Sequence, residues 1–185
     1  MKKIYNPQAE TWLEICKRPT QTFTDIEETV KQIFKEVQQK GDKAIEKYAS
    51  LFDGVTLENI QVSKEEIEWA KKDVTAELKE AIQLAKSNIE QFHTAQKTDK
   101  IVVETTKGVT CWQEKRPIQK VGLYIPGGTA PLFSTVLMLA VPAKIAGCQE
   151  IVLCSPSDKN GKINSAILYA ADLCGVSKIY KVGGI

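Results

Sequence analysis

Residues 121–132 read VGLYIPGGTAPL, and this stretch decides how the second half of the chain is interpreted. An apolar run, Val121–Ile125, ends at Pro126-Gly127-Gly128, and an apolar stretch long enough for a helix begins at Phe133. A strand that ends in a glycine turn before a helix begins many nucleotide-binding units. The G-x-G-x-x-G spacing of dinucleotide-binding loops is absent here. The residues alone therefore leave two interpretations open, a cofactor loop or a plain tight turn.

The elements around this loop predict an α/β fold. Strands are expected at about residues 121–125, 151–154 and 178–182, and helices at about 134–146 and 164–174. Near-continuous apolar strands that alternate with helices indicate a parallel sheet with right-handed crossovers. The sequence stops at KVGGI, directly after the last strand. We therefore expect a truncated chain whose open sheet edge and apolar surface cause self-association.

The first part of the chain has a helical pattern instead. Apolar residues recur every three or four positions until His93. Thr24 with Glu27, and Ser63 with Glu66, have the spacing of capping boxes that start helices. A break between two helices is expected near Asp73-Val74-Thr75.

A hairpin is predicted between the two regions, because β-branched residues lie on both sides of Lys107-Gly108. The expected organisation is thus a helical N-terminal region at residues 1–99, a β-hairpin connector at 100–119 and an α/β domain at 120–185.

Composition excludes several classes of protein. The chain has 185 residues, is 43% apolar and 26% charged, and carries a net charge of +2, which is too weak a bias to indicate nucleic-acid binding. The longest apolar run, near Val136–Ala143, is broken by Pro142 and is too short to span a membrane. The N-terminus lacks the apolar core of a signal peptide. We expect a cytoplasmic protein that binds neither membranes nor nucleic acid, with its five cysteines as free thiols.

Residues suited to catalysis are scarce. The single histidine, His93, ends a long amphipathic helix and has no partners at metal-ligand spacing. No G-x-S-x-G elbow is present. The remaining candidates follow the strands: Tyr124 and the glycines after it, and the hydroxyls of Ser155 and Ser157. Ser134 or Thr135 could cap the helix that follows the first loop, whose free amides would favour an anion.

Longer stretches of the sequence resemble one known family. The likeness is carried by VGLYIPGGTAPLFSTVLMLAVPAKIAGCQEIVLCSP at 121–156 and ILYAADLCGVSKIYKVGGI at 167–185, with IEQFHTAQK at 89–97 and the lead-in KRPIQKVGLYIPGG at 115–128. These segments are similar to the central part of histidinol dehydrogenase, and the likeness covers nearly the whole chain. Phe133 stands where the family commonly has proline, which we expect to change the stiffness of the loop and not its course.

The resemblance implies an NAD- and zinc-dependent oxidoreductase that converts L-histidinol to L-histidine in two steps, the last reactions of histidine biosynthesis. In that family two NAD molecules each take a hydride, a zinc ion binds the substrate and a Glu/His pair moves protons. The family's homodimers build their sites from both subunits. Its large domains are incomplete Rossmann-like units of aldehyde-dehydrogenase-like architecture, so residues 120–185 would form part of one.

Carried onto this sequence, the resemblance assigns cofactor contacts to Tyr124, Pro126, Gly127 and Gly128. The family's zinc ligands and its Glu/His pair lie further along than this chain extends. We therefore expect no catalytic residue, no zinc and no activity in this chain alone. The sequence does not identify an acidic or basic residue that would distinguish NAD from NADP.

Two hypotheses follow. The first is a portion of histidinol dehydrogenase. The alternative is a non-catalytic α/β module that binds a nucleotide or anion, or self-associates. Continuation of the gene past Ile185 into segments rich in His, Asp and Glu would favour the first, and a natural stop codon the second.

Overall fold

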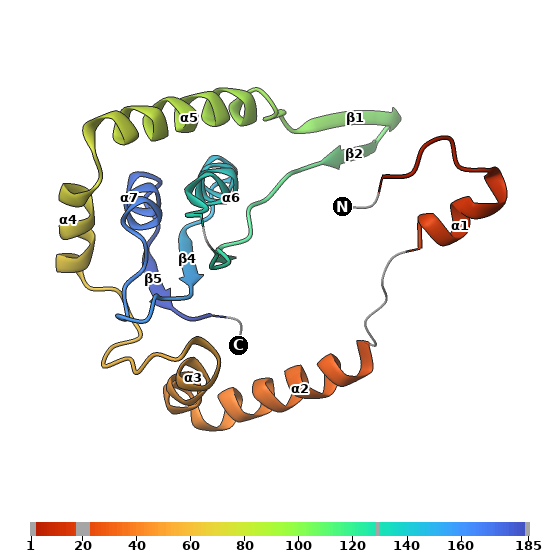
Figure 1. The fold of residues 1–185 in the computed structure, drawn as a ribbon. Helices are drawn as coiled ribbons and strands as arrows, with labels where there is room; N and C mark the ends of the chain where they lie inside the picture. Colours follow the sequence, from red (N-terminus) through yellow and green to blue (C-terminus); the bar gives the residue numbers. More distant parts are fainter. Residues whose placement is uncertain (1–2, 18–22, 129, 184–185) are drawn as a thin grey trace.

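The α/β body of the molecule confirms the predicted fold class. The computed structural model describes residues 3–17, 23–128 and 130–183. Within these residues, one sheet consists of three parallel strands in the order β3 (Lys120–Tyr124), β4 (Glu150–Ser155) and β5 (Lys178–Lys181). The crossover helices α6 (Phe133–Ala146) and α7 (Ser165–Leu173) pack side by side on one face of this sheet (Figure 1). All five elements lie within one or two residues of their expected positions.

Helices from the first half of the chain complete this body. The helix α4 (Lys64–Asp73) packs against α7, and α5 (Ala76–Thr94) packs against α6. Ser63 caps α4 through a capping box with Glu66, as predicted, and the chain breaks between Asp73 and Ala76. Residues from α4 to β5 share one hydrophobic core, which includes Ala70, Ile82, Leu137, Leu153 and Ala170. The expected boundaries at residues 99 and 119 stay a prediction.

The outer edge of β5 is covered by the chain itself, which corrects the expectation of an open edge there. Gln61 forms an antiparallel bridge with Tyr180. The Val62 amide donates to the Ile179 carbonyl at 2.9 Å, and the Lys181 amide donates to the Ile60 carbonyl at 2.7 Å. A segment that no strand pattern marks in the sequence therefore protects this edge.

Two arms extend from the body and give the molecule a crescent shape (Figure 1). One arm is the predicted hairpin, β1 (Ile101–Thr106) paired with β2 (Val109–Gln113). The other holds α2 (Phe23–Lys40), α3 (Asp42–Tyr48) and the π-helical turn η2 (Ala49–Asp53), and it leads to the short helices α1 (Trp12–Ile15) and η1 (Ala9–Thr11). The side chain of Thr24, the other expected cap, lies outside the described residues.

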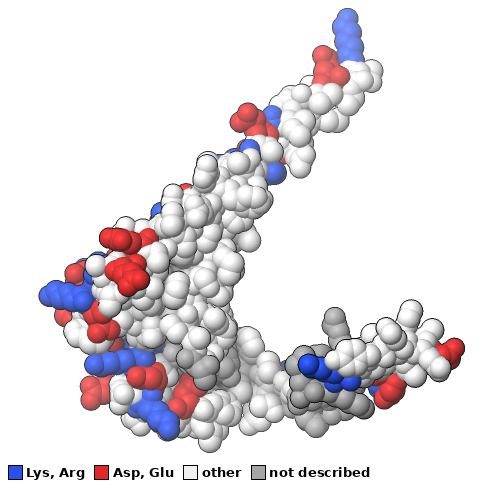
Figure 2. Space-filling view, turned by 45° about the horizontal axis from the view of Figure 1, so that its top comes forward, with Lys and Arg blue, Asp and Glu red and all other residues white. Residues whose placement is uncertain are grey.

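The concave side of the crescent is largely uncharged, whereas Lys, Arg, Asp and Glu gather on the convex side (Figure 2). Large apolar side chains are exposed on both arms, among them Ile26, Val30, Phe34, Val102 and Trp112. A two-stranded hairpin exposed on both faces does not hold its shape alone in water, so both arms have the surface of an interface. Among the described residues, no helix is long and apolar enough to cross a membrane.

Candidate functional site

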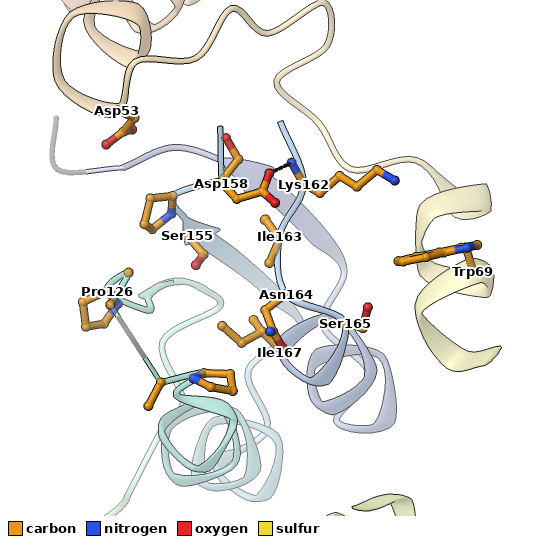
Figure 3. Close-up of a pocket in the computed structure, with 16 residues that line it drawn as sticks. Asp53, Trp69, Pro126, Ser155, Asp158, Lys162, Ile163, Asn164, Ser165 and Ile167 are labelled. Atoms are coloured by element: carbon orange, nitrogen blue, oxygen red, sulfur yellow. Dashed lines mark hydrogen bonds between the residues drawn. The ribbon is translucent and has the colours of Figure 1, made fainter. Parts of the chain in front are cut away.

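A cavity of about 530 Å³ lies at the carboxyl ends of β3 and β4, where α/β proteins bind their ligands. Its walls are the loop after β3, the loop after β4 and the start of α7 (Figure 3). Pro126, Gly127 and Gly128 line it, and so do Ser155 and Ser157. The structure therefore brings together three of the four residues that the resemblance assigns to the cofactor.

The two loop glycines have different reasons for being glycine. A Cβ on Gly127 would lie 2.7 Å from Cγ of Pro156, so this glycine lets the two loops touch. A Cβ on Gly128 would meet nothing within 4 Å, and the backbone of Gly128 does not have a positive φ. Neither packing nor conformation explains Gly128, which leaves room at the cavity wall for a molecule to approach the backbone.

Tyr124 does not line this cavity. Side chains alternate along a strand, so Val121 and Leu123 face the helices while Tyr124 lies on the other face of the sheet, paired in register with Cys154. The Tyr124 side chain is 46% exposed. Partial burial raises the pKa of its hydroxyl, and the charge of Asp53 raises it further. Tyr124 thus stands beside the cavity, close enough to Asp53 for their charges to interact.

Most polar groups of the cavity wall are satisfied by other parts of the chain. Asn164 caps α7 by accepting from the Ala166 amide at 2.9 Å, and the Ser165 hydroxyl donates to Asp73 at 2.7 Å. The Asp158 carboxylate accepts from the backbone amides of Asn160 and Lys162, both at 2.9 Å. These contacts hold the loop after β4 in shape.

Two serines of the wall are shielded from solvent, and the hydroxyl of one of them, Ser157, lacks a hydrogen-bond partner among the described residues. Ser155 is 1% exposed, and in Figure 3 its hydroxyl points into the space between Pro126 and Asn164. The Oγ atom of Ser157 is buried without a hydrogen bond to any described group. A buried hydroxyl without a partner costs free energy, so each such group requires an explanation. A polar ligand in the cavity would supply the missing partner of Ser157.

The helix after the first loop starts differently from the prediction. Leu132 is the N-cap residue of α6, and no side chain caps it. Ser134 and Thr135 lie inside the first turn, so their expected role as caps is wrong. The amides at this end consequently lack a side-chain acceptor in the described structure, and such a helix end attracts anions.

Asp53, Trp69 and Lys162 also line the cavity, and sequence reasoning missed all three. Asp53 is the last residue of η2, and Trp69 lies on α4. In Figure 3 Asp53 lies at one side of the cavity and Trp69 at the other. Lys162 Nζ lies 4.8 Å from the centre of the Trp69 ring, a cation–π contact. Of these three residues, only Trp69 could have been found from the sequence, because it is a large aromatic residue that does not belong to the apolar repeat of its helix.

Other reactive side chains lie elsewhere. His93 hydrogen-bonds Gln96 at 2.8 Å, near the end of α5 and away from this cavity. All five cysteines are free thiols, and burial raises the pKa of Cys174 to about 11 and that of Cys154 in the same direction. Within the described ranges, no group of three or more His, Cys, Asp or Glu side chains could hold a metal ion.

Fold and site together define an α/β protein with a cavity lined by polar groups at the carboxyl ends of its parallel strands. Comparisons with known proteins are more specific. A family model described as histidinol dehydrogenase matches residues 16–185, and the chain belongs to this family.

Individual relatives agree with this assignment. Histidinol dehydrogenase from Bacteroides thetaiotaomicron is 58% identical over the whole chain, and that from Campylobacter jejuni is 54% identical over 92% of it. The crystal structure of histidinol dehydrogenase from Elizabethkingia anophelis matches 97% of the chain with a TM-score of 0.90 and 50% identity. The chain spans 43% of the Bacteroides protein and 41% of the chain in that crystal structure.

Proposed function

We propose that this chain supplies one wall of the NAD site of a histidinol dehydrogenase, which oxidises L-histidinol to L-histidine in two steps. The observation that carries the proposal is the cavity after β3 and β4, with its open backbone at Gly128, the buried Ser155 and the unpartnered hydroxyl of Ser157. NAD would accept the hydride in each step. Pro126, Gly127 and Gly128 would hold it from the loop, with Tyr124 beside them on the sheet face.

The features of the cavity suit a dinucleotide. The uncapped N-terminus of α6 suits a pyrophosphate, because free amides and the helix dipole both favour an anion. Buried serine hydroxyls suit the polar groups of a nucleoside. The Trp69 ring offers an apolar surface at the other side of the cavity.

The zinc of the family has no comparable support in this chain, because the described residues provide no ligand set. The groups that would move protons lie, by the resemblance, outside residues 1–185. The proposed role of this chain is therefore to bind and orient the cofactor, in a protein that we expect in the cytoplasm, and chemistry by this chain alone is not expected.

The alternative of a self-associating module draws on the apolar concave surface. In our proposal that surface contacts other parts of the enzyme, including a second subunit. The two functions are compatible, and NAD binding separates the enzyme portion from a module that only associates.

Thermal unfolding of the 185-residue chain tests the proposal. We expect NAD to raise Tm, L-histidinol alone to leave it unchanged, and no NADH to form when both are present. Tyr124→Ala should reduce the NAD-dependent shift, while the matched surface variant Tyr5→Ala should keep it. No shift with NAD would overturn the cofactor site, and NADH formation would overturn the expected inactivity.

A further inference from the structure

Asp53 is an acidic residue of the cavity wall whose carboxylate has no partner of opposite charge among the described residues. Asp158 holds its own loop, and Lys162 lies over Trp69. Asp53, by contrast, forms no hydrogen bond or ion pair with any described residue. Its partial burial raises the pKa of the carboxyl group, which means that the charged form is held there at a cost. A cavity carboxylate without a partner in the chain is suited to a partner from outside.

Two neighbours describe the position of Asp53. A Cβ on Gly183, directly after β5, would overlap the Oδ2 atom of Asp53, so the carboxylate touches the backbone there. Its charge also reaches Tyr124. Asp53 therefore lies where the end of β5, the cavity and the Tyr124 side of the sheet meet.

Other nucleotide-binding folds take a carboxylate for this purpose from the sheet itself. In Rossmann units an Asp or Glu at the end of the second strand binds the ribose hydroxyls of NAD. Here the strand after the glycine loop and its helix is β4, which ends at Ser155. The first acid after it, Asp158, accepts hydrogen bonds from the amides of its own loop. The π-helical turn at the end of α3 brings one from outside the sheet instead.

We propose that Asp53 binds the adenosine ribose of NAD and selects against NADP. This inference rests on the proposed function. The two carboxylate oxygens can accept hydrogen bonds from the 2′ and 3′ hydroxyls together. In NADP the 2′ hydroxyl carries a phosphate, which cannot donate when ionised and repels the Asp53 charge. Partial burial strengthens this repulsion relative to water.

Isothermal titration calorimetry with NAD and with NADP tests the inference on the wild-type chain and on Asp53→Asn. We expect the wild-type chain to bind NAD at least about tenfold more tightly than NADP, as for removal of one close charge repulsion. Asp53→Asn keeps the shape and removes the charge, so the ratio should fall to within about threefold. Asp53→Ser is a second variant, and thermal unfolding reports whether each variant is folded.

Asp42→Asn is the matched control, because Asp42 opens α3 on the same arm and does not line the cavity. It should leave both affinities unchanged. Equal binding of NAD and NADP by the wild-type chain, or an unchanged ratio in both Asp53 variants, would overturn the inference while the nucleotide site stands. Binding of neither nucleotide by the wild-type chain would overturn the proposed function itself.

Discussion

Gly127 and Pro156 join the loops after β3 and β4, since a single Cβ on Gly127 would come within 2.7 Å of the proline ring. The contact fixes the spacing of the two walls of the cavity. Gly128, the next residue, faces open space at the same wall. The two adjacent glycines therefore differ in purpose: Gly127 permits a contact within the chain, and for Gly128 we propose access for a molecule from outside.

Alanine substitutions at the two glycines separate these purposes. Gly127→Ala should lower the free energy of unfolding by about 1–3 kcal/mol, because the proline ring and its loop must shift. Gly128→Ala should leave stability unchanged or raise it by about 0.4–1 kcal/mol, since alanine restricts the unfolded chain. Urea unfolding measures both changes. In titrations with NAD, the Gly128→Ala variant should bind NAD more weakly than the wild-type chain does. Equal stability of the two variants would contradict the contact between Gly127 and Pro156.

The ion pair between Lys181 and Glu66 fastens α4 to the edge strand. Lys181 Nζ lies 2.6 Å from Glu66 Oε1, and its side chain is only 10% exposed. The other oxygen of Glu66 accepts from the Ser63 amide at 2.9 Å. Glu66→Gln should cost about 1–3 kcal/mol, since it leaves a nearly buried ammonium group without its counter-charge.

Lys181→Met should cost less than Glu66→Gln, because no charge is left buried. The double variant should be more stable than the sum of the two single losses predicts. Chemical denaturation of all four chains measures this coupling. Strictly additive losses would show that the pair does not couple the helix to the strand.

Acid should loosen the hairpin of α2 and α3. Glu36 accepts from Tyr48 Oη at 2.6 Å and from Lys47 Nζ at 2.8 Å, and its bonds to Lys40, Lys47 and Tyr48 lower its pKa from 4.5 to about 2. A lowered pKa means that the stabilisation is complete above the unfolded value and is lost as pH falls through the folded value. The loss is therefore expected between pH 4.5 and about 2.

Hydrogen exchange of the α2 and α3 amides across this pH range measures the loosening. Glu36→Gln should remove most of the pH dependence, whereas Glu46→Gln, on the exposed surface of α3, should keep it. An unchanged acid response in Glu36→Gln would assign the effect to another group.

The apolar stripe on α2 should drive self-association. Ile26, Val30 and Phe34 repeat every four residues along one side of the helix, and Phe34 is 71% exposed. We expect oligomers by light scattering at about tens of micromolar, where exposed apolar surface associates. Val30→Ser with Phe34→Ser should shift the chain toward monomer. Leu84→Ser, on exposed α5 surface, is the control, and a monomeric wild-type chain at this concentration would contradict the prediction.

The sequence predicted the elements whose signals are local. Continuous apolar strands, the capping box at Ser63 and the hairpin around Lys107-Gly108 each depend on neighbours in the chain, and all were confirmed. Leu132 was missed as the N-cap because hydroxyl residues nearby have the higher propensity, and packing of the loop determined the start of the helix.

Such local patterns could not predict contacts between residues far apart in the sequence. In the sequence Asp53 directly precedes Gly54, and the pair indicates only that a helix ends there. Its place at the cavity depends on how the arm docks beside β5. Likewise, Gln61 has no strand pattern, because a single bridge needs no alternation of apolar residues.

The bridge between Gln61 and Tyr180 also affects the order in which the chain folds. The segment around Gln61 emerges early from the ribosome, whereas β5, which contains Tyr180, is made only after the helices α6 and α7. Until β5 has been made, Asp53 lacks its contact with the backbone at Gly183, so the Asp53 side of the cavity cannot form during synthesis. Closing so long a loop is entropically costly and slow. Folding of the site should therefore be a cooperative step, in which the segment around Gln61 takes its place only after β5 has been made.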